Sequence, residues 1–182
     1  MNPTCNWTVI STCRKDDPDR SGRFFSAIKI YNAKGKMGDL DDGPIQEPLK
    51  IEQVEQMILS LLPARNYDLI ITHSIEGEYT RHRRHEEVAK AVTTLVETGR
   101  LQTDELLIFA YEDGNKKHFP RPIESAETIV QLPDHIWMKK YKIITETYGF
   151  DEQSWEAKTT PVKEAFWNFK SAAVTKERGL AK

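Results

Sequence analysis

The sequence predicts an α/β fold, with a mostly parallel sheet and helices on both of its faces. Short runs rich in β-branched and aromatic residues alternate with longer amphipathic runs, and this order is typical of repeated strand–helix–strand units. A chain of 182 residues is also long enough for one domain with a sizeable core, and it leaves little room for a second. We therefore expect a single α/β domain over residues 1–182.

The first strand is predicted at Trp7–Cys13, because Trp, Val, Ile and Thr are enriched in strands. A polar run at Asp16–Asp19 ends it. The following segment, Arg23–Lys34, has the spacing of an amphipathic helix, with one apolar face. A short strand at Lys36–Leu40 then leads to the turn signal Asp-Asp-Gly-Pro at residues 41–44.

A second helix is expected from Ile51 to Leu62, where apolar residues recur at helical spacing until Pro63 stops the pattern. The run at Asp68–Thr72 is typical of a buried parallel strand. A third helix is predicted at about Arg83–Glu97, with Gly99 ending it. Glu105–Tyr111 is the next strand.

The last third of the chain differs in character, since prolines divide it into short segments. Asp134–Thr147 is predicted to be helical, and another helix is expected from about Pro161 through Lys170. The aromatic residues of this part are expected to pack as a cover on the sheet. They are Trp137, Tyr141, Trp155, Phe166, Trp167 and Phe169.

Composition argues against several classes of protein. A mean hydropathy of -0.60 and the lack of any apolar run of about 18 residues argue against a membrane span. The first residues lack the basic start and apolar stretch of a signal peptide. With 26 Lys+Arg against 28 Asp+Glu, an electrostatic nucleic-acid partner is not expected. The two cysteines lie too close together to build a disulfide framework, so we predict a soluble, cytoplasmic protein.

Polar residues that follow the predicted strands are the candidates for a functional site. Ligands of open α/β sheets bind outside the carboxyl ends of the strands. Asp41 and Asp42 follow the second strand, and His73 follows the third. The loop after His73 leads to His82 and His85, so that three of the five histidines fall within 13 residues.

The spacing of His82 and His85 places both on one face of the third helix, in line with its apolar residues. Both imidazoles then point inward at a helix N-terminus, where the helix dipole disfavours the imidazolium form. Neutral imidazole binds metal ions and accepts protons. The alternative is a pair of first-turn histidines hydrogen-bonded to nearby carboxylates, because this spacing also arises by chance.

The charged residues around the histidines have simpler explanations. Arg81, Arg83 and Arg84 are expected to form a solvated, basic helix start that Glu86 and Glu87 balance, in preference to a phosphate contact. The acidic residues at positions 41 and 42 are likewise explained more simply as turn formers than as site residues.

The segment THSIEGEYTRHRRHEEVAKAV, from Thr72 to Val92, resembles the PIG-L (LmbE-like) de-N-acetylase family. In that family a Gly-x-Tyr loop runs into a helix that opens with a His-x-x-His pair. GDLDDGP at Gly38–Pro44 is similar to a glycine- and aspartate-containing loop of the family, and RKDDPDR at Arg14–Arg20 to the segment after its second strand. The resemblance covers about residues 7–112 and implies a Rossmann-like domain, with residues 113–182 as a C-terminal cover.

The resemblance also implies an activity, namely the metal-dependent hydrolysis, usually with zinc, of the N-acetyl group of an N-acetylglucosamine-type glycoconjugate. It implies that His85 is a metal ligand, and that His82 stabilises the developing oxyanion or acts as the acid. The candidate substrate-binding residues are Asp41, Asp42, His73 and Tyr79.

The sequence departs from the family pattern at its start. The family's His-Pro-Asp-Asp motif supplies the other histidine ligand, the aspartate ligand and the general base, and it is not found here. We therefore expect a chain that lacks the N-terminal strand and helix, with unpaired strand edges and little turnover. The alternative is a non-catalytic carbohydrate-binding or interaction module with the same fold.

Overall fold

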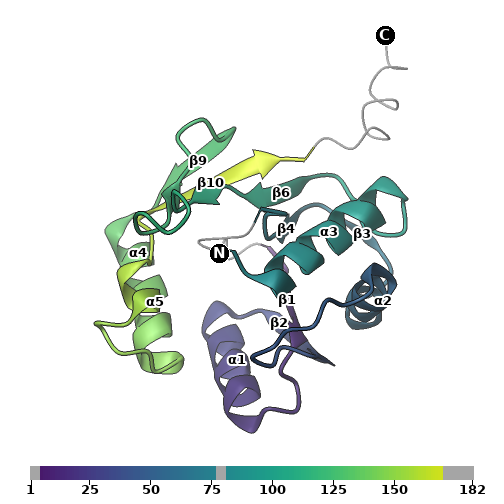
Figure 1. Ribbon diagram of the computed structural model, residues 1–182, viewed down its shortest axis with the longest axis horizontal. Helices are drawn as coiled ribbons and strands as arrows, with labels where there is room; N and C mark the ends of the chain where they lie inside the picture. Colours follow the sequence, from purple (N-terminus) through teal and green to yellow (C-terminus); the bar gives the residue numbers. More distant parts are fainter. Residues whose placement is uncertain (1–4, 77–80, 170–182) are drawn as a thin grey trace.

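The computed structural model describes residues 5–76 and 81–169, which form an α/β fold (Figure 1). The first unit consists of β1 (Thr8–Cys13), α1 (Pro18–Tyr31) and β2 (Lys34–Leu40), and its two strands are parallel. The strands predicted at Trp7–Cys13 and Lys36–Leu40 are therefore confirmed to within two residues.

Helix α1 begins and ends earlier than the predicted range of Arg23–Lys34. Its N-cap is Asp17, whose side chain accepts a hydrogen bond from the backbone N–H of Arg20 at 3.0 Å. Pro18 occupies the first turn, where the N–H that proline lacks is not needed. At the other end, Asn32 adopts the left-handed conformation (φ 52°) and terminates the helix.

Helices cover both faces of the β1–β2 pair. A Cβ atom at Gly35 would meet Phe24 and Ile28 of α1, whereas one at Gly38 would meet Met57 of the next helix, α2 (Ile51–Leu61). Residues 35 and 38 face opposite sides of β2, because side chains alternate along a strand. The expected arrangement of helices on both faces is therefore present in this unit.

The second unit consists of β4 (Ile70–Thr72), α3 (Arg83–Glu97) and β6 (Leu106–Phe109), and its strands are again parallel. The predicted second helix ends one residue early, at Leu61, and the third has the predicted bounds. Gly99 follows α3 in the left-handed conformation (φ 69°). A further short parallel pair consists of β3 (Asn66–Tyr67) and β5 (Gln102–Thr103).

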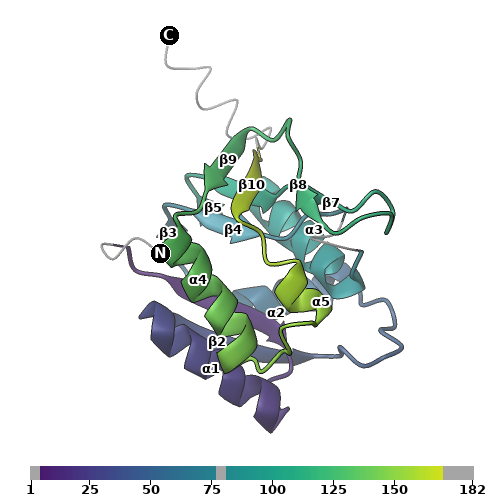
Figure 2. The same ribbon diagram turned by 90° about the vertical axis from the view of Figure 1, so that its left-hand side faces the viewer.

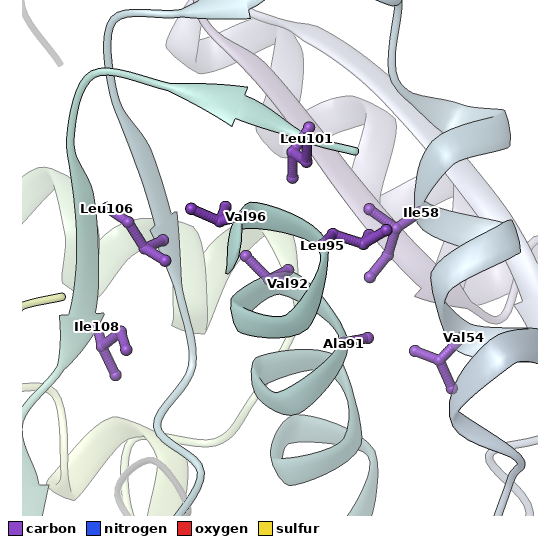
Figure 3. Close-up of a cluster of buried hydrophobic side chains, with 9 residues drawn as sticks. All are labelled: Val54, Ile58, Ala91, Val92, Leu95, Val96, Leu101, Leu106 and Ile108. Carbon is purple, nitrogen blue, oxygen red and sulfur yellow. The ribbon is translucent and has the colours of Figure 1, made fainter. Parts of the chain in front are cut away.

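The main core lies between α2 and the second unit, to which α3 and β6 contribute (Figure 3). Apolar side chains from both helices meet there, and Ile58 and Leu95 are fully buried. This explains the helical spacing of apolar residues in both segments. The core residues are Val54, Ile58, Ala91, Val92, Leu95, Val96, Leu101, Leu106 and Ile108.

The C-terminal third extends the second unit. Figure 2 shows α4 running from β9 towards α1, where the π-helical turn that follows α4 contacts α1. Within the described ranges, none of the helices is long and apolar enough to cross a membrane. The elements are β7 (Tyr111–Glu112), β8 (Arg121–Pro122), β9 (Thr128–Gln131), α4 (Asp134–Lys142), the π-helical turn (Ile143–Thr147), α5 (Trp155–Lys158) and β10 (Lys163–Asn168).

The helix expected from about Pro161 through Lys170 is wrong, because this segment contains strand β10. Strand β10 pairs with β6 on one side and with β9 on the other, antiparallel to both. Ala165 and Phe166 are buried. This part of the predicted cover is therefore a strand inserted in the sheet.

The strands do not form the single, mostly parallel sheet that was expected. Among the described residues there are four sheets, and the largest has the order β4–β6–β10–β9 with one parallel and two antiparallel pairs. The β1–β2 pair is separate. Between β1 and β4 lies a groove of about 410 Å³, which we call the central groove. On the side of the groove, neither β1 nor β4 pairs with another described strand.

Candidate functional site

Three histidines gather at the carboxyl end of β4. His73 follows that strand directly, His82 is the N-cap residue of α3, and His85 lies in its first turn. The rings of His73 and His85 are stacked, with centroids 4.0 Å apart and planes at 6°. The ring of His82 lies 4.4 Å from that of His85. The structure thus brings together three of the residues that the sequence singled out.

His85 is held in its neutral form. The pKa of its imidazole is lowered from 6.5 to about 3, chiefly by burial and to a smaller extent by the neighbouring His73 and His82. Protonation would place a charge in a poorly solvated position next to two other imidazoles. At neutral pH, His85 is therefore in the form that binds a metal ion, and its low pKa makes it a weak base.

His82 is oriented by Gln46. The side-chain nitrogen of Gln46 lies 2.7 Å from a carboxylate oxygen of Asp42 and 3.2 Å from Nε2 of His82. Because a carboxylate only accepts hydrogen bonds, the NH₂ group of Gln46 must face Asp42, and its second N–H then donates to His82. Neutral His82 consequently carries its proton on Nδ1. This nitrogen is buried and has no hydrogen-bond partner among the described residues.

The loop at residues 41–50 is clamped onto the start of α3. Arg84 donates to the backbone carbonyls of Asp41 and Glu47 and pairs with the carboxylate of Glu87. Glu87 in turn accepts a hydrogen bond from the backbone N–H of Leu49 at 3.0 Å. Arg83 donates to the backbone carbonyl of Gln46 at 2.7 Å. These contacts place Gln46 beside His82.

Arg84 therefore corrects the expectation of a solvated basic helix start. Its side chain is only 4% exposed. Arg81 does behave as expected, since it is 67% exposed and pairs with Glu86 at 2.5 Å. The difference follows from position, because Arg84 lies on the inward face of α3 and Arg81 precedes the helix.

The two acidic candidates at the turn have structural partners. Asp41 accepts from the backbone N–H of Gly43 at 3.1 Å, as a turn former does, and pairs with Arg84 at 3.3 Å. Asp42 binds Arg14 at 3.1 Å as well as Gln46. Asp42 is connected to the histidines through Gln46, whereas Asp41 supports the loop.

Gln46 and Arg84 are the residues that sequence reasoning missed. Gln46 belongs to no motif, and its backbone has the left-handed conformation (φ 47°), which no local signal indicates. Tyr79, a candidate substrate-binding residue, lies outside the described residues.

The described histidines do not form a complete zinc site by themselves. Among the described residues there is no group of three or more His, Cys, Asp or Glu side chains placed to hold a metal ion. Tetrahedral zinc needs ring nitrogens that converge on one point. The parallel stack of His73 and His85 presents ring faces to each other instead.

Comparison with known proteins indicates a fold but no family. No family model matches the chain. The chain is 23% identical over 134 residues to an uncharacterized protein of Acanthamoeba polyphaga mimivirus; the match covers 74% of this chain and 54% of that protein, so it spans about half of the relative's length. Among solved structures, the chain resembles GalB, the 4-carboxy-2-hydroxymuconate hydratase of Pseudomonas putida. That likeness has a TM-score of 0.57 at 13% identity, over 91% of this chain and 84% of GalB, and concerns the fold alone.

Proposed function

We propose that the histidine cluster is part of the site of a metal-dependent N-deacetylase, with zinc as the metal and an N-acetylglucosamine-type glycoconjugate as the substrate. The observation that carries the proposal is the neutral imidazole of His85, which is in contact with His73 and His82 at the carboxyl end of β4. Neutral imidazole is the form that binds zinc. We assign His85 as one metal ligand, and expect little turnover while further ligands are lacking.

We assign to His82 a hydrogen bond to the substrate. Gln46 occupies Nε2 of its ring, so that the Nδ1–H group remains to donate to the carbonyl oxygen of an amide. Such a donor stabilises the negative charge that develops on this oxygen when the carbonyl is attacked. Asp42 acts on the substrate only through Gln46 in this proposal, and therefore serves to position His82.

We also propose that the two parallel units belong to one doubly wound, Rossmann-like sheet. Each unit is a strand–helix–strand crossover, and α2 packs against both β1 and α3. A shared helical layer is what two halves of one open sheet would have. The central groove is the place where their edges would be joined.

Zinc binding and acetate release test the proposed activity. We expect the full chain to bind zinc at neutral pH, and His85→Ala to weaken this binding by at least about tenfold. Acetate release from methyl N-acetylglucosaminide should be slow and should stop when a chelator is added. The matched control is His135→Ala, since His135 is exposed and lies far along the chain in α4.

Two results would change this interpretation. Fast turnover that a chelator abolishes would support the deacetylase and show that no further ligands are needed. Absence of zinc binding, together with absence of acetate release, would contradict the metal role of His85 and the activity alike.

A second candidate function is a non-catalytic module that binds an amino sugar. The observation that favours it is the lack, within the described residues, of three side chains placed to hold a metal ion. It predicts that methyl N-acetylglucosaminide binds equally well with and without a chelator. It also predicts that His85→Ala leaves this binding within about twofold of the original chain.

A further inference from the structure

The central groove runs along two strand edges. Successive residues of both walls line it, Trp7–Ile10 on one side and Ile70–His73 on the other. Side chains of successive strand residues point to opposite faces of a sheet. Residues of both faces can line one groove only where the groove follows the edge of the strand.

Both edges carry backbone groups that point into the groove. The N–H of Ile70 donates to Glu105 at 2.9 Å, so the backbone of Ile70 faces β6, and that of Ile71 faces the opposite way. The carbonyl of Trp7 likewise accepts from Lys34 of β2, and the backbone of Thr8 faces away from β2. Neither β1 nor β4 pairs with any other described strand on this side.

A side chain in the groove also lacks a partner. The indole nitrogen of Trp7 is buried and has no hydrogen-bond acceptor among the described residues. A buried N–H group without an acceptor costs free energy. An occupant that brought a carbonyl oxygen into the groove would satisfy it.

The remaining walls are mostly apolar, and Asn6, Arg65 and Tyr67 are the residues with polar groups among them. Ile58, Val92 and Phe109 contribute to the lining, and Ile58 and Val92 belong to the main core. A strand that is covered on both faces has an almost continuous run of Val, Ile and Leu. The occupant that fits two facing edges with apolar surroundings is therefore an extended, uncharged stretch of polypeptide.

We propose that the central groove binds an extended, apolar peptide strand of a partner polypeptide, which pairs through its backbone with β1 and β4. Addition of a strand to an exposed edge is an established mode of peptide binding. Here two edges would be satisfied at once. The strand would also reach His73, which lines the same groove. This inference does not depend on the proposed deacetylase activity.

The test uses a synthetic peptide of about seven residues, acetylated and amidated, with Val and Ile between terminal lysines. We expect the full chain to bind it in calorimetry, with a change in tryptophan emission that Trp7→Phe removes. Ile71→Pro removes the N–H that faces the groove and leaves the β4–β6 hydrogen bonds in place, because proline is tolerated on an edge strand. It should weaken binding by at least about tenfold.

The matched control is Ile129→Pro in β9, the other edge of the same sheet. Leu132 donates to Val162 of the neighbouring segment, so that by alternation the N–H of Ile129 points outward. Ile129 is 44% exposed as a residue, close to the 38% of Ile71. We expect this variant to bind the peptide as the original chain does.

A second peptide keeps the proposal testable if Ile71→Pro fails to fold. N-methylation at alternate residues removes backbone donors without removing apolar side chains, and should abolish binding. Equal binding of both peptides, or no binding of either, would overturn the proposal. Loss of binding in Ile129→Pro alone would also overturn it. A dimer of the original chain that Ile71→Pro dissociates would overturn it as well, since a second copy would then occupy the groove.

Discussion

Gln46 determines which nitrogen of His82 carries the proton. Both N–H groups of its amide are used, one by Asp42 and one by Nε2 of His82. The tautomer of His82 therefore depends on the side chain of Gln46, which does not itself ionise.

We predict that nitrogen NMR of the original chain shows neutral His82 protonated at Nδ1. Gln46→Met removes the donor to Nε2, so that a proton can occupy this nitrogen and the Nε2–H tautomer becomes populated. Gln131→Met, on the exposed side of β9, is the control and should leave the His82 spectrum unchanged. An original chain in which His82 is protonated at Nε2 would contradict this account.

Arg84 stabilises the loop at residues 41–50 from a buried position. Arg84→Met should lower the free energy of unfolding by about 3 kcal/mol, because it leaves the carboxylate of Glu87 without its ion-pair partner and two backbone carbonyls without their donor. Asp41 contributes little to this figure, since its side chain is 59% exposed. Urea unfolding measures the effect. Arg81→Met, at an exposed ion pair, should leave the free energy of unfolding almost unchanged, and equal losses in both variants would contradict the prediction.

At the scale of residues, sequence spacing predicted the histidine cluster but not its supports. Helical spacing predicted that His82 and His85 lie together, and their ring centroids are 4.4 Å apart, although His82 is the N-cap residue that precedes α3. Arg84 lies four residues before Val88, so the same periodicity placed it near the buried stripe. Gln46 could not be found in this way, because its contacts join segments 36 residues apart.

The start of α1 depends on its cap. Asp17→Ala removes the side-chain acceptor for the N–H of Arg20, and should lower the free energy of unfolding by about 1 kcal/mol. The neighbouring Asp16 is exposed and caps no helix, so Asp16→Ala should have almost no effect. Thermal unfolding of both variants measures the difference. If α1 instead began at Arg23, neither substitution would lower the stability.

At the scale of elements, local sequence signals were sufficient to predict the secondary structure of some segments only. The bounds of α3 follow from its apolar stripe and from Gly99, both of which are local. The segment of β10 follows Pro161 and contains both good strand formers and residues compatible with a helix. Its conformation is decided by pairing with β6 and β9, which lie more than 30 residues away.

At the scale of the whole molecule, the alternation of strands and helices predicted the α/β class and the parallel pairs. It could not predict that the sheet continues through antiparallel strands, because the partner of β10 is set by burial of Phe166 and Ala165 and not by chain order. The division between the β1–β2 pair and the larger sheet is likewise a property of the assembled chain.

The stability of the whole molecule should depend on pH through His85. Its pKa is lowered in the native state to about 3, so the native chain binds fewer protons than the unfolded chain between about pH 3 and 6.5. The resulting stabilisation is complete above this range and is lost as the pH falls through it. We expect urea unfolding to show a steeper loss with falling pH in the original chain than in His85→Gln.

The control for this pH series is His135→Gln, which should retain the slope of the original chain because His135 is exposed. The slopes are compared, and not the absolute stabilities, since His85→Gln also alters packing. Identical slopes in the original chain and in His85→Gln would mean that His85 is solvated and titrates normally.

The hydrogen bond between the backbone N–H of Leu49 and the carboxylate of Glu87 makes opening of the site measurable by hydrogen exchange. This amide proton is shielded while the loop lies on α3, and it can exchange with deuterium only when the loop lifts. Its exchange rate therefore reports how often the surroundings of His82 open. A ligand that closes the site would slow this single proton before it changed the melting of the chain.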